Sequence, residues 1–338
     1  RPPSGGARRL PDAPGSPTEG NLVWRECLVA TDDSDRVTGG LILEVAPWRV
    51  GDRDEKVALA RAVIEPESDR EILLSLVTDA QRRFPMTALV DDTRLPQGTA
   101  AAIKEQGFRA LPCESYYRVC HPRTYLKNLG SLRSSAAWRF LTDVAAATGV
   151  GAIGILSLQA SRRKKRGRLG RLEVGPAAEF TSEAGELWQR GAQGYSLARV
   201  ATRQVLNALY QAEDRGLHRL LVRLDGAAIG WAVVSERRMK RHPRFGDMCV
   251  GSIDDCFAVK EHADAVMTMA SEYLERRDMD IVLTRQAHAW WQSAMANAGA
   301  LRGETSLWLW LSGTLVRAIE EHDTGFDKVH VCFGLDSE

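Results

Sequence analysis

Two neighbouring acids, Asp254 and Asp255, lie in a short apolar run at residues 252–259, and the loop Lys260-Glu-His-Ala263-Asp-Ala265 follows them. A strand places successive side chains on opposite faces, so one carboxylate is predicted to face a cleft, where it could take a proton from an amine. The other interpretation is structural: one acid pairs with an arginine and the other caps a bulge. In the loop, small residues open a helix whose free N–H groups could receive a phosphate.

The segments around these residues change their period in a fixed order. Residues 252–259 have the length of a strand, and the apolar residues from Ala263 to Leu274 follow helical spacing. Residues 280–283 read as a second buried strand. Helical spacing returns from Trp290 to Ala298 and stops at Gly299. The order strand, helix, strand, helix therefore positions the acids and the loop.

This stretch resembles the cofactor half of the GCN5-related N-acetyltransferase (GNAT) family, whose loop Arg/Gln-x-x-Gly-x-Gly/Ala holds the pyrophosphate of acetyl-CoA. Lys260, Ala263 and Ala265 stand at the loop's positions. Lysine keeps the cationic end, and alanine is the smallest residue that still has a Cβ. The resemblance implies acetyl-CoA or another acyl-CoA as co-substrate and transfer to an amine of a small molecule or amino sugar. The residues implied to hold the cofactor are Cys256, Phe257, Val259, Lys260, Ala263 and Ala265.

The first part of the chain repeats the same order of elements. Its expected elements are strands 27–31, 37–46 and 57–64, a helix begun by a capping box at Ser68, strand 87–90, helix 96–106 and closing strand 110–119. The expected elements of the second copy are an opening strand at 172–175, helices between 179 and 210, a hairpin of strands 217–224 and 227–235, and closing strand 306–311. The sequence predicts an α/β protein with two tandem GNAT-like domains, each a mixed, mostly antiparallel sheet flanked by helices.

This tandem pattern is similar to bacterial double-GNAT proteins, including the FemAB-like group and members associated with surface polysaccharides. The expected ranges are a disordered leader at 1–20, a truncated and degenerate N-terminal domain at 21–125, a helical and basic connector at 126–170 and a C-terminal domain at 171–338. The N-terminal copy looks truncated because the chain begins with Arg1 rather than Met and the copy lacks an opening strand and helix.

The last helix departs from the family pattern. GNAT enzymes often place an Asn and a Tyr there, seven residues apart, to act on the departing thiolate. Met295 takes the Tyr position and His288 the Asn position in the second copy, while the first copy has Ile103 and Pro96. His288 is read either as a proton relay or as a helix cap, and the cap is the commoner role at a helix start. The candidate catalytic residues are therefore Asp254, Asp255 and His288.

The phosphate loop of the first copy is acidic. It reads Glu65-Pro-Glu-Ser68-Asp-Arg70, and its carboxylates would repel a pyrophosphate. We therefore expect only the second copy to bind CoA. A catalytically inactive pair of GNAT folds that serves as a scaffold, and a FemAB-like transferase that uses aminoacyl-tRNA, remain as alternatives.

Composition narrows the classes of partner. The 338 residues suit two domains. The 45 basic and 44 acidic residues give no overall field for nucleic acid. Six cysteines without a Cys-x-x-Cys pair favour reduced thiols in a cytoplasmic protein, and neither metal site nor secretory signal is predicted.

The connector between the copies is apolar and then basic. Residues 136–147 read as an apolar helix, residues 150–158 as a further apolar run, and Arg162-Arg-Lys-Lys-Arg166 with Arg168 as a basic cluster. Such a segment could lie on an anionic membrane surface. The interpretation that the sequence favours is a packed interdomain helix followed by solvated charges. No aromatic residues interleave with the basic ones, which argues against single-stranded nucleic acid.

Overall fold

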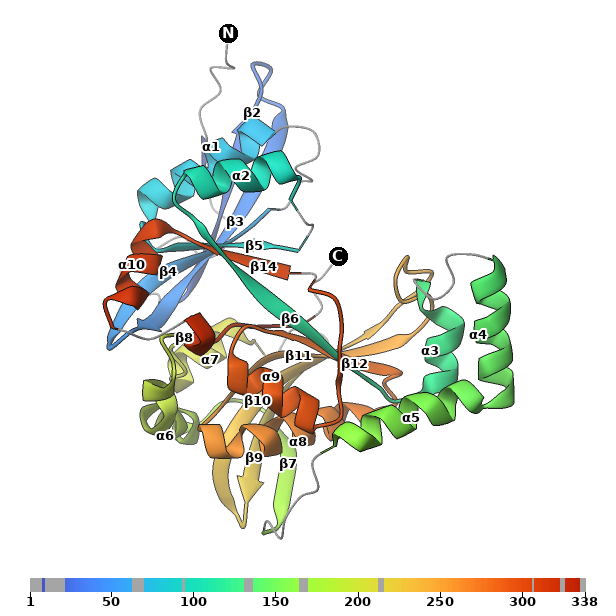
Figure 1. Cartoon of the computed structure of the whole chain (residues 1–338). Coiled ribbons are helices and arrows are strands. Elements are labelled where there is room, and N and C mark those ends of the chain that lie inside the picture. Colours follow the sequence, from blue (N-terminus) through green and yellow to red (C-terminus); the bar gives the residue numbers. More distant parts are fainter. Residues whose placement is uncertain are drawn as a thin grey trace. The chain divides into compact units, whose positions relative to one another are not determined.

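The computed structural model describes residues 8–9, 22–62, 70–92, 95–130, 136–163, 170–211, 216–305, 307–322 and 326–334. The chain divides into two compact units, whose courses can be followed in Figure 1. The first unit takes residues 1–113, 195–209 and 305–330, and the second takes 114–194, 210–304 and 331–338. Each unit thus gathers separate segments, whereas the sequence suggested continuous ranges.

The first unit is a sheet with helices on it. Its strands are β1 (Arg8–Arg9), β2 (Trp24–Thr31), β3 (Val37–Val50), β4 (Arg53–Ala62), β5 (Thr87–Asp91), β8 (Leu197–Arg199), β14 (Leu307–Leu311) and the start of β6 (Arg109–Val119). Its helices are α1 (Arg70–Arg83), α2 (Gln97–Glu105), α7 (Arg203–Leu209), α10 (Gly313–Glu320) and the 3-10 turn η4 (Phe326–Lys328). The strand order is β1-β2-β3-β4-β5-β14-β6, and β4 and β5 are parallel neighbours. Helix α1 turns Leu73, Leu76 and Val77 into the core.

The second unit repeats this plan around another parallel pair. Its strands are the end of β6, β7 (Leu172–Ala177), β9 (Leu217–Leu224), β10 (Ala227–Arg238), β11 (Cys249–Ala258), β12 (Ile281–Gln286), β13 (Leu301–Arg302) and β15 (Cys332–Phe333). Its helical elements are α3 (Pro122–Asn128), α4 (Ala136–Thr148), α5 (Val150–Arg162), α6 (Ser182–Gly191), η2 (Ala192–Gly194), η3 (Lys260–His262), α8 (Ala263–Glu275) and α9 (Ala289–Asn297). The strand order is β6-β12-β11-β10-β9-β7, and β11 and β12 are parallel.

The closing strands of the two copies are exchanged, which corrects the sequence prediction. Strand β14 was expected to close the second copy, but it pairs with β5 in the first unit. Strand β6 pairs through residues 109–113 with β14 in the first unit and through residues 114–119 with β12 in the second. Likewise β8, from the expected opening of the second copy, pairs with β3. Alternation of apolar and polar residues identifies a strand but not the strand with which it pairs, because the same alternation fits a neighbour in either unit.

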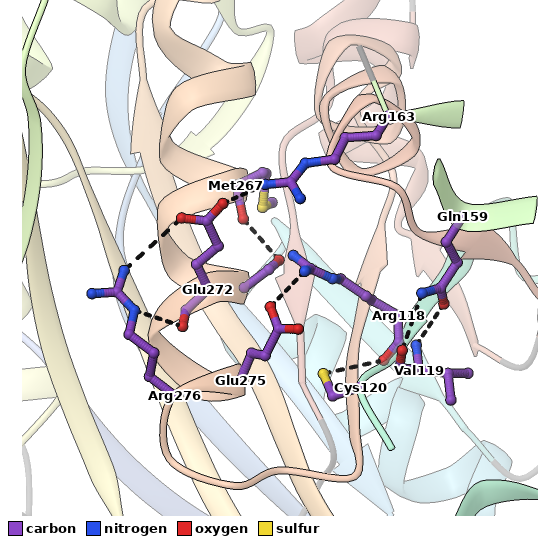
Figure 2. A network of polar contacts seen from close by, with 10 residues as sticks. Arg118, Val119, Cys120, Gln159, Arg163, Met267, Glu272, Glu275 and Arg276 are labelled. Carbon is purple, nitrogen blue, oxygen red and sulfur yellow. Dashed lines mark hydrogen bonds and ion pairs between the residues drawn. The ribbon is translucent and has the colours of Figure 1, made fainter. Parts of the chain in front are cut away.

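Polar contacts fix the C-terminal part of helix α5 (Figure 2), and Ile155 of the same helix packs against the core cluster that includes Leu126 and Ala146. Gln159 is its buried residue, and the Gln159 side chain bonds both main-chain groups of Val119. Arg163, directly after the helix, pairs with Glu272 of α8 at 2.5 Å. Val150 and Ile153 are 68% and 66% exposed. Helix α5 therefore packs inward through Ile155 and Gln159 and leaves Val150 and Ile153 exposed.

Four sequence expectations fall on residues outside the described ranges. These are the leader at residues 1–20 apart from β1, the capping box at Ser68, the acidic loop before Arg70 and the basic cluster after Arg163. In the described part of the chain no single helix has the length and apolar content to cross a membrane. The pair Leu141–Thr148 and Val150–Arg162, bent by 78°, meets that test only when taken together.

Candidate functional site

The parallel strands β11 and β12 separate partway along their length. They pair from Val250 with Ile281 to Ser252 with Leu283. Beyond Ser252, the strand pairing of β11 in the described part of the chain is with β10 alone. The other edge of β11 therefore carries main-chain groups that strand β12 does not use, and it runs directly into the Lys260 loop.

The short strand β15 lies at the place where the two strands separate. It pairs with β12 through Arg285 with Phe333 and Gln286 with Cys332. It also contacts β11, where the Cys332 thiol donates to the carbonyl oxygen of Ile253 at 3.4 Å. The Thr284 hydroxyl donates to the same oxygen at 2.9 Å. Side chains thus take over the bonds that a regular ladder would supply.

The floor of this region is polar and buried. Gln286 donates to the Cys332 sulfur at 2.8 Å and to the Thr284 hydroxyl at 3.0 Å, and its Oε1 is buried without a hydrogen-bond partner. Burial, reinforced by the neighbouring Cys332, raises the pKa of the Cys256 thiol well above its usual value. Cys256 therefore stays a neutral thiol, which makes it a lining residue rather than a nucleophile.

The predicted phosphate loop forms a 3-10 turn followed by α8. Lys260 is exposed, whereas Ala263 and Ala265 are buried. Residue His262 occupies the N-cap of α8 and makes no side-chain capping bond, and the N–H of Ala263 donates to the carbonyl oxygen of Lys260 in the preceding 3-10 turn. Asp264 in the first turn accepts two bonds from Asn297, each 3.1 Å long.

The two adjacent acids lie at a bulge in β11. Val233 of β10 pairs with Asp255 and Val234 pairs with Ile253, so Asp254 is the extra residue. Both oxygens of Asp255 are engaged, one by the Tyr210 hydroxyl at 2.5 Å and one by the N–H of Cys256 at 2.8 Å. The structure thus contains the bulge of the structural interpretation, and the Tyr210 phenol is one of the partners of Asp255.

Asp254 lies beside the polar floor and β15. The Ser252 hydroxyl donates to it at 2.5 Å, and Ser252 is in turn bonded to Ser235 at 2.8 Å. A Cβ added to Gly334 would meet the Asp254 carboxylate, so the chain after β15 passes closely over this acid. Asp254 is also less buried than Asp255. These contacts place Asp254, and not Asp255, where the strands separate.

Tyr210 is a residue that the sequence did not single out as functional. It follows α7 and is positioned by Arg219, whose Nε donates to the Tyr210 carbonyl at 2.9 Å and whose Nη1 donates to the carbonyl of Ala178. No phenol stands at the family position Met295, which is fully buried in α9. The phrase Leu206-Asn207-x-x-Tyr210 was visible in the sequence, but nothing local links it to Asp255.

The other predicted site residues have mixed positions. His288 is the N-cap of α9, where its Nδ1 accepts from the N–H of Trp290 at 3.2 Å, and it is 2% exposed. The Phe257 ring packs among Trp188 and Trp231, so only its main chain can face a ligand. Val259 immediately precedes the 3-10 turn. The roles of these residues in catalysis or binding stay predictions.

Comparisons with known proteins identify the fold. No family model matches the sequence, and no curated protein matches it. Two solved structures of Saccharomyces cerevisiae N-myristoyltransferase, one with bound myristoyl-CoA and one with myristoyl-CoA and inhibitors, are similar with TM-scores of 0.50 and identities of 10% and 9%. Both cover 84% of this chain, which spans 65% and 66% of theirs.

A third solved structure is a GCN5-related N-acetyltransferase from Anabaena variabilis ATCC 29413, with a TM-score of 0.47, 12% identity, and coverage of 84% of this chain and 62% of its own. The likeness to the two N-myristoyltransferase structures confirms the predicted fold class: a mixed, mostly antiparallel α/β architecture of the acyl-CoA N-acyltransferase type.

Proposed function

We propose that this protein is an acyl-CoA-dependent N-acyltransferase whose site lies in the second unit. One observation carries the proposal: the edge of β11 that β12 leaves unpaired leads into the start of α8, which has no side-chain cap and has Lys260 beside it. Main-chain edges and helix starts are the parts of a fold that bind extended amide chains and phosphates. The similarity to an N-myristoyltransferase fold supports the same function.

The cofactor side of the site follows from this arrangement. Lys260 supplies the cation for the pyrophosphate, and the small residues Ala263 and Ala265 let the phosphate approach the helix start. The main chains of Cys256, Phe257 and Val259 line the path along β11. Glu261 and Asp264 oppose a second negative charge, so Lys260 has to offset them.

The acceptor is an amine, which must lose a proton before it can attack a thioester. We assign this proton to Asp254, because it lies where β11 and β12 separate and is less buried than Asp255. Asp255 with Tyr210 then positions the bulge. A small-molecule amine or an amino sugar is the acceptor that we propose, and acetyl the acyl group.

The first unit has a structural role in this proposal. Its parallel strands β4 and β5 stay paired through four successive residues, from Ala58 with Thr87 to Arg61 with Val90. The pair β11 and β12 is joined at only three positions. In the first unit the pairing therefore persists almost to the end of both strands, and β4 and β5 do not separate as β11 and β12 do.

Binding of acetyl-CoA and longer acyl-CoAs to the full chain, measured by calorimetry, tests the proposal. Lys260→Glu should weaken binding by about 1.5–3 kcal/mol, or about 10- to 150-fold, because a charge-assisted contact is lost. Lys104→Glu, an equally exposed lysine of α2 in the first unit, should change affinity less than about twofold. Equal losses in both variants would show that the cofactor site is misplaced.

The scaffold alternative has a specific observation in its favour, because the family's phenol position holds the buried Met295. The scaffold alternative predicts that the protein does not bind acyl-CoA. If neither acetyl-CoA nor a longer acyl-CoA binds the wild-type chain, the scaffold replaces the enzyme. A FemAB-like reaction would instead show binding of aminoacyl-tRNA without binding of acyl-CoA.

A further inference from the structure

The helices α4 and α5 expose an apolar face that no described part of the chain covers. Its members are Leu141 at 54%, Val144 at 43%, Val150 at 68%, Ile153 at 66%, Leu156 at 50% and Leu158 at 47% exposed. On α4, Leu141 and Val144 lie opposite the buried Thr142 and Ala146. On α5, Gln159 is the buried residue. The two helices thus present large side chains to solvent along both of their lengths.

The attachment of α5 explains why this face is free. The helix is fixed by the Gln159 amide on Val119 and by the ion pair of Arg163 with Glu272 (Figure 2). Both contacts are polar and lie in its last turns. Ile155 of α5 packs against the core cluster that includes Leu126 and Ala146, whereas Val150, Ile153, Leu156 and Leu158 remain exposed. The helix is therefore held on one side and presents the rest of its apolar side chains to solvent.

Basic side chains lie on elements next to α4 and α5. The Arg123 guanidinium of α3 lies 3.7 Å from the position of a Cβ on Gly149, at the turn between α4 and α5. Arg238, Lys240, Arg241 and Arg244, in the connection from β10 to β11, are also exposed. Phe245 and Met248 of that connection pack into one core cluster with Leu126 of α3 and Ala146 of α4.

We propose that this face, formed by α4, α5 and the neighbouring cations, docks the protein on an anionic lipid membrane. Binding to an anionic membrane is favoured when apolar side chains enter the interface and cationic side chains contact the anionic headgroups. Residues 150–172 contain no acidic residue. A second copy of the chain would instead bring the same cations together, which opposes self-association through this face.

The helices lie on the membrane and do not cross it. Each has 13 residues and so is about 20 Å long, against a hydrocarbon core of about 30 Å. The turn at Gly149, with φ of +79°, bends the pair by 78°. Both helices are therefore too short to span the core, and the bend prevents them from acting as one straight rod.

Sedimentation of the full chain with vesicles tests the proposal independently of any acyl-CoA binding. The wild type should bind vesicles with about 30% phosphatidylserine, bind pure phosphatidylcholine at least about tenfold more weakly, and lose affinity when salt rises from about 0.1 M to about 0.5 M. Ile153→Glu with Leu156→Glu should lower the partition coefficient at least about tenfold. Both positions are exposed, so the fold should survive.

Matched control variants distinguish vesicle binding through this face from non-specific hydrophobic or electrostatic binding elsewhere on the protein. Val37→Glu, 44% exposed in the first unit, should leave vesicle binding unchanged. Lys240→Glu with Arg241→Glu should reduce binding at least about 25-fold, about fivefold for each cation, whereas Lys104→Glu should change it less than twofold. The proposal is overturned if the wild type ignores anionic vesicles, or if Ile153→Glu with Leu156→Glu has no effect on vesicle binding. Self-association that this variant abolishes, without vesicle binding, would assign the face to a second copy.

Discussion

The buried amide of Gln159, which joins α5 to Val119 of β6, gives a specific stability prediction. In Gln159→Leu the side-chain volume is nearly kept, but both main-chain bonds to Val119 disappear. The N–H of Val119 donates to Oε1 at 2.8 Å and its carbonyl accepts from Nε2 at 3.0 Å. Gln159 is 7% exposed and Val119 is 1% exposed, so water cannot readily replace the amide.

The magnitude follows from the two groups left without partners. Each buried polar group without a hydrogen bond costs about 1–3 kcal/mol, giving about 2–6 kcal/mol in total. Burial of leucine in place of the amide returns about 1–2 kcal/mol. The local stability of α5 should therefore fall by about 1–4 kcal/mol, unless the segment opens first by a route of lower free energy.

Hydrogen exchange of peptides covering residues 150–162 measures this opening. The loss corresponds to about 5- to 700-fold faster exchange, up to the limit set by the wild-type protection. The control is Ile153→Gln on the same helix, which is 66% exposed and should change stability by less than about 0.5 kcal/mol. The reasoning fails if Ile153→Gln accelerates exchange as much as Gln159→Leu, because α5 would then be held by its apolar face.

Three further predictions concern the second unit. Asp254→Asn should lower turnover in steady-state kinetics by about 10²–10⁴-fold and leave acyl-CoA affinity nearly unchanged, whereas Asp255→Asn should mainly lower the melting temperature. If Asp255→Asn lowers turnover and Asp254→Asn lowers the melting temperature, the roles of the two residues are exchanged. Gly230→Ala places a Cβ 2.6 Å from a main-chain oxygen of β11, so the free energy of unfolding in urea should fall by about 1–3 kcal/mol. Gly175→Ala, whose Cβ meets nothing within 4 Å, should lower it less, and equal urea midpoints for the two variants would contradict this packing. Burial raises the pKa of the Cys120 thiol from its ordinary value of 9.0 to about 12, so above pH 9 the unfolded chain loses a proton that the folded chain keeps. The free energy of unfolding should therefore fall by about 1.4 kcal/mol per pH unit between about pH 9 and pH 12, and Cys120→Ala should remove that part of the slope in unfolding measured against pH.

Much of the fold was readable from local patterns. The hairpin at residues 217–224 and 227–235, the helix from Ala263 and the end of α9 at Gly299 agree with the structure to within a few residues, because period and turn residues act over short distances. The exchange of β6 and β14 was not readable, since strand pairing is decided by residues far apart in the sequence.

In the candidate site, too, local features were readable from the sequence and long-range contacts were not. The acids and the lysine loop follow from order along the chain, and the structure places them on one strand and the turn after it. The bond between Tyr210 and Asp255 joins residues 45 positions apart and left no local signal. The apolar composition of α5 suggested burial, yet composition does not say which side chains of a hydrophobic helix face the protein, and here Gln159 and Ile155 face inward while Val150 and Ile153 are exposed.

The exchanged strand β14 also sets the order in which the protein can be made. A nascent chain emerges from the ribosome N-terminus first, and an ordinary first domain folds while the rest is still being translated. Here β5 and β6 receive the strand between them only when Leu307–Leu311 has been synthesised. Until then residues 88–91 and 109–113 have open edges that invite aggregation. The first unit therefore depends on late synthesis and a long loop closure, so its folding should be slow and chaperone-sensitive.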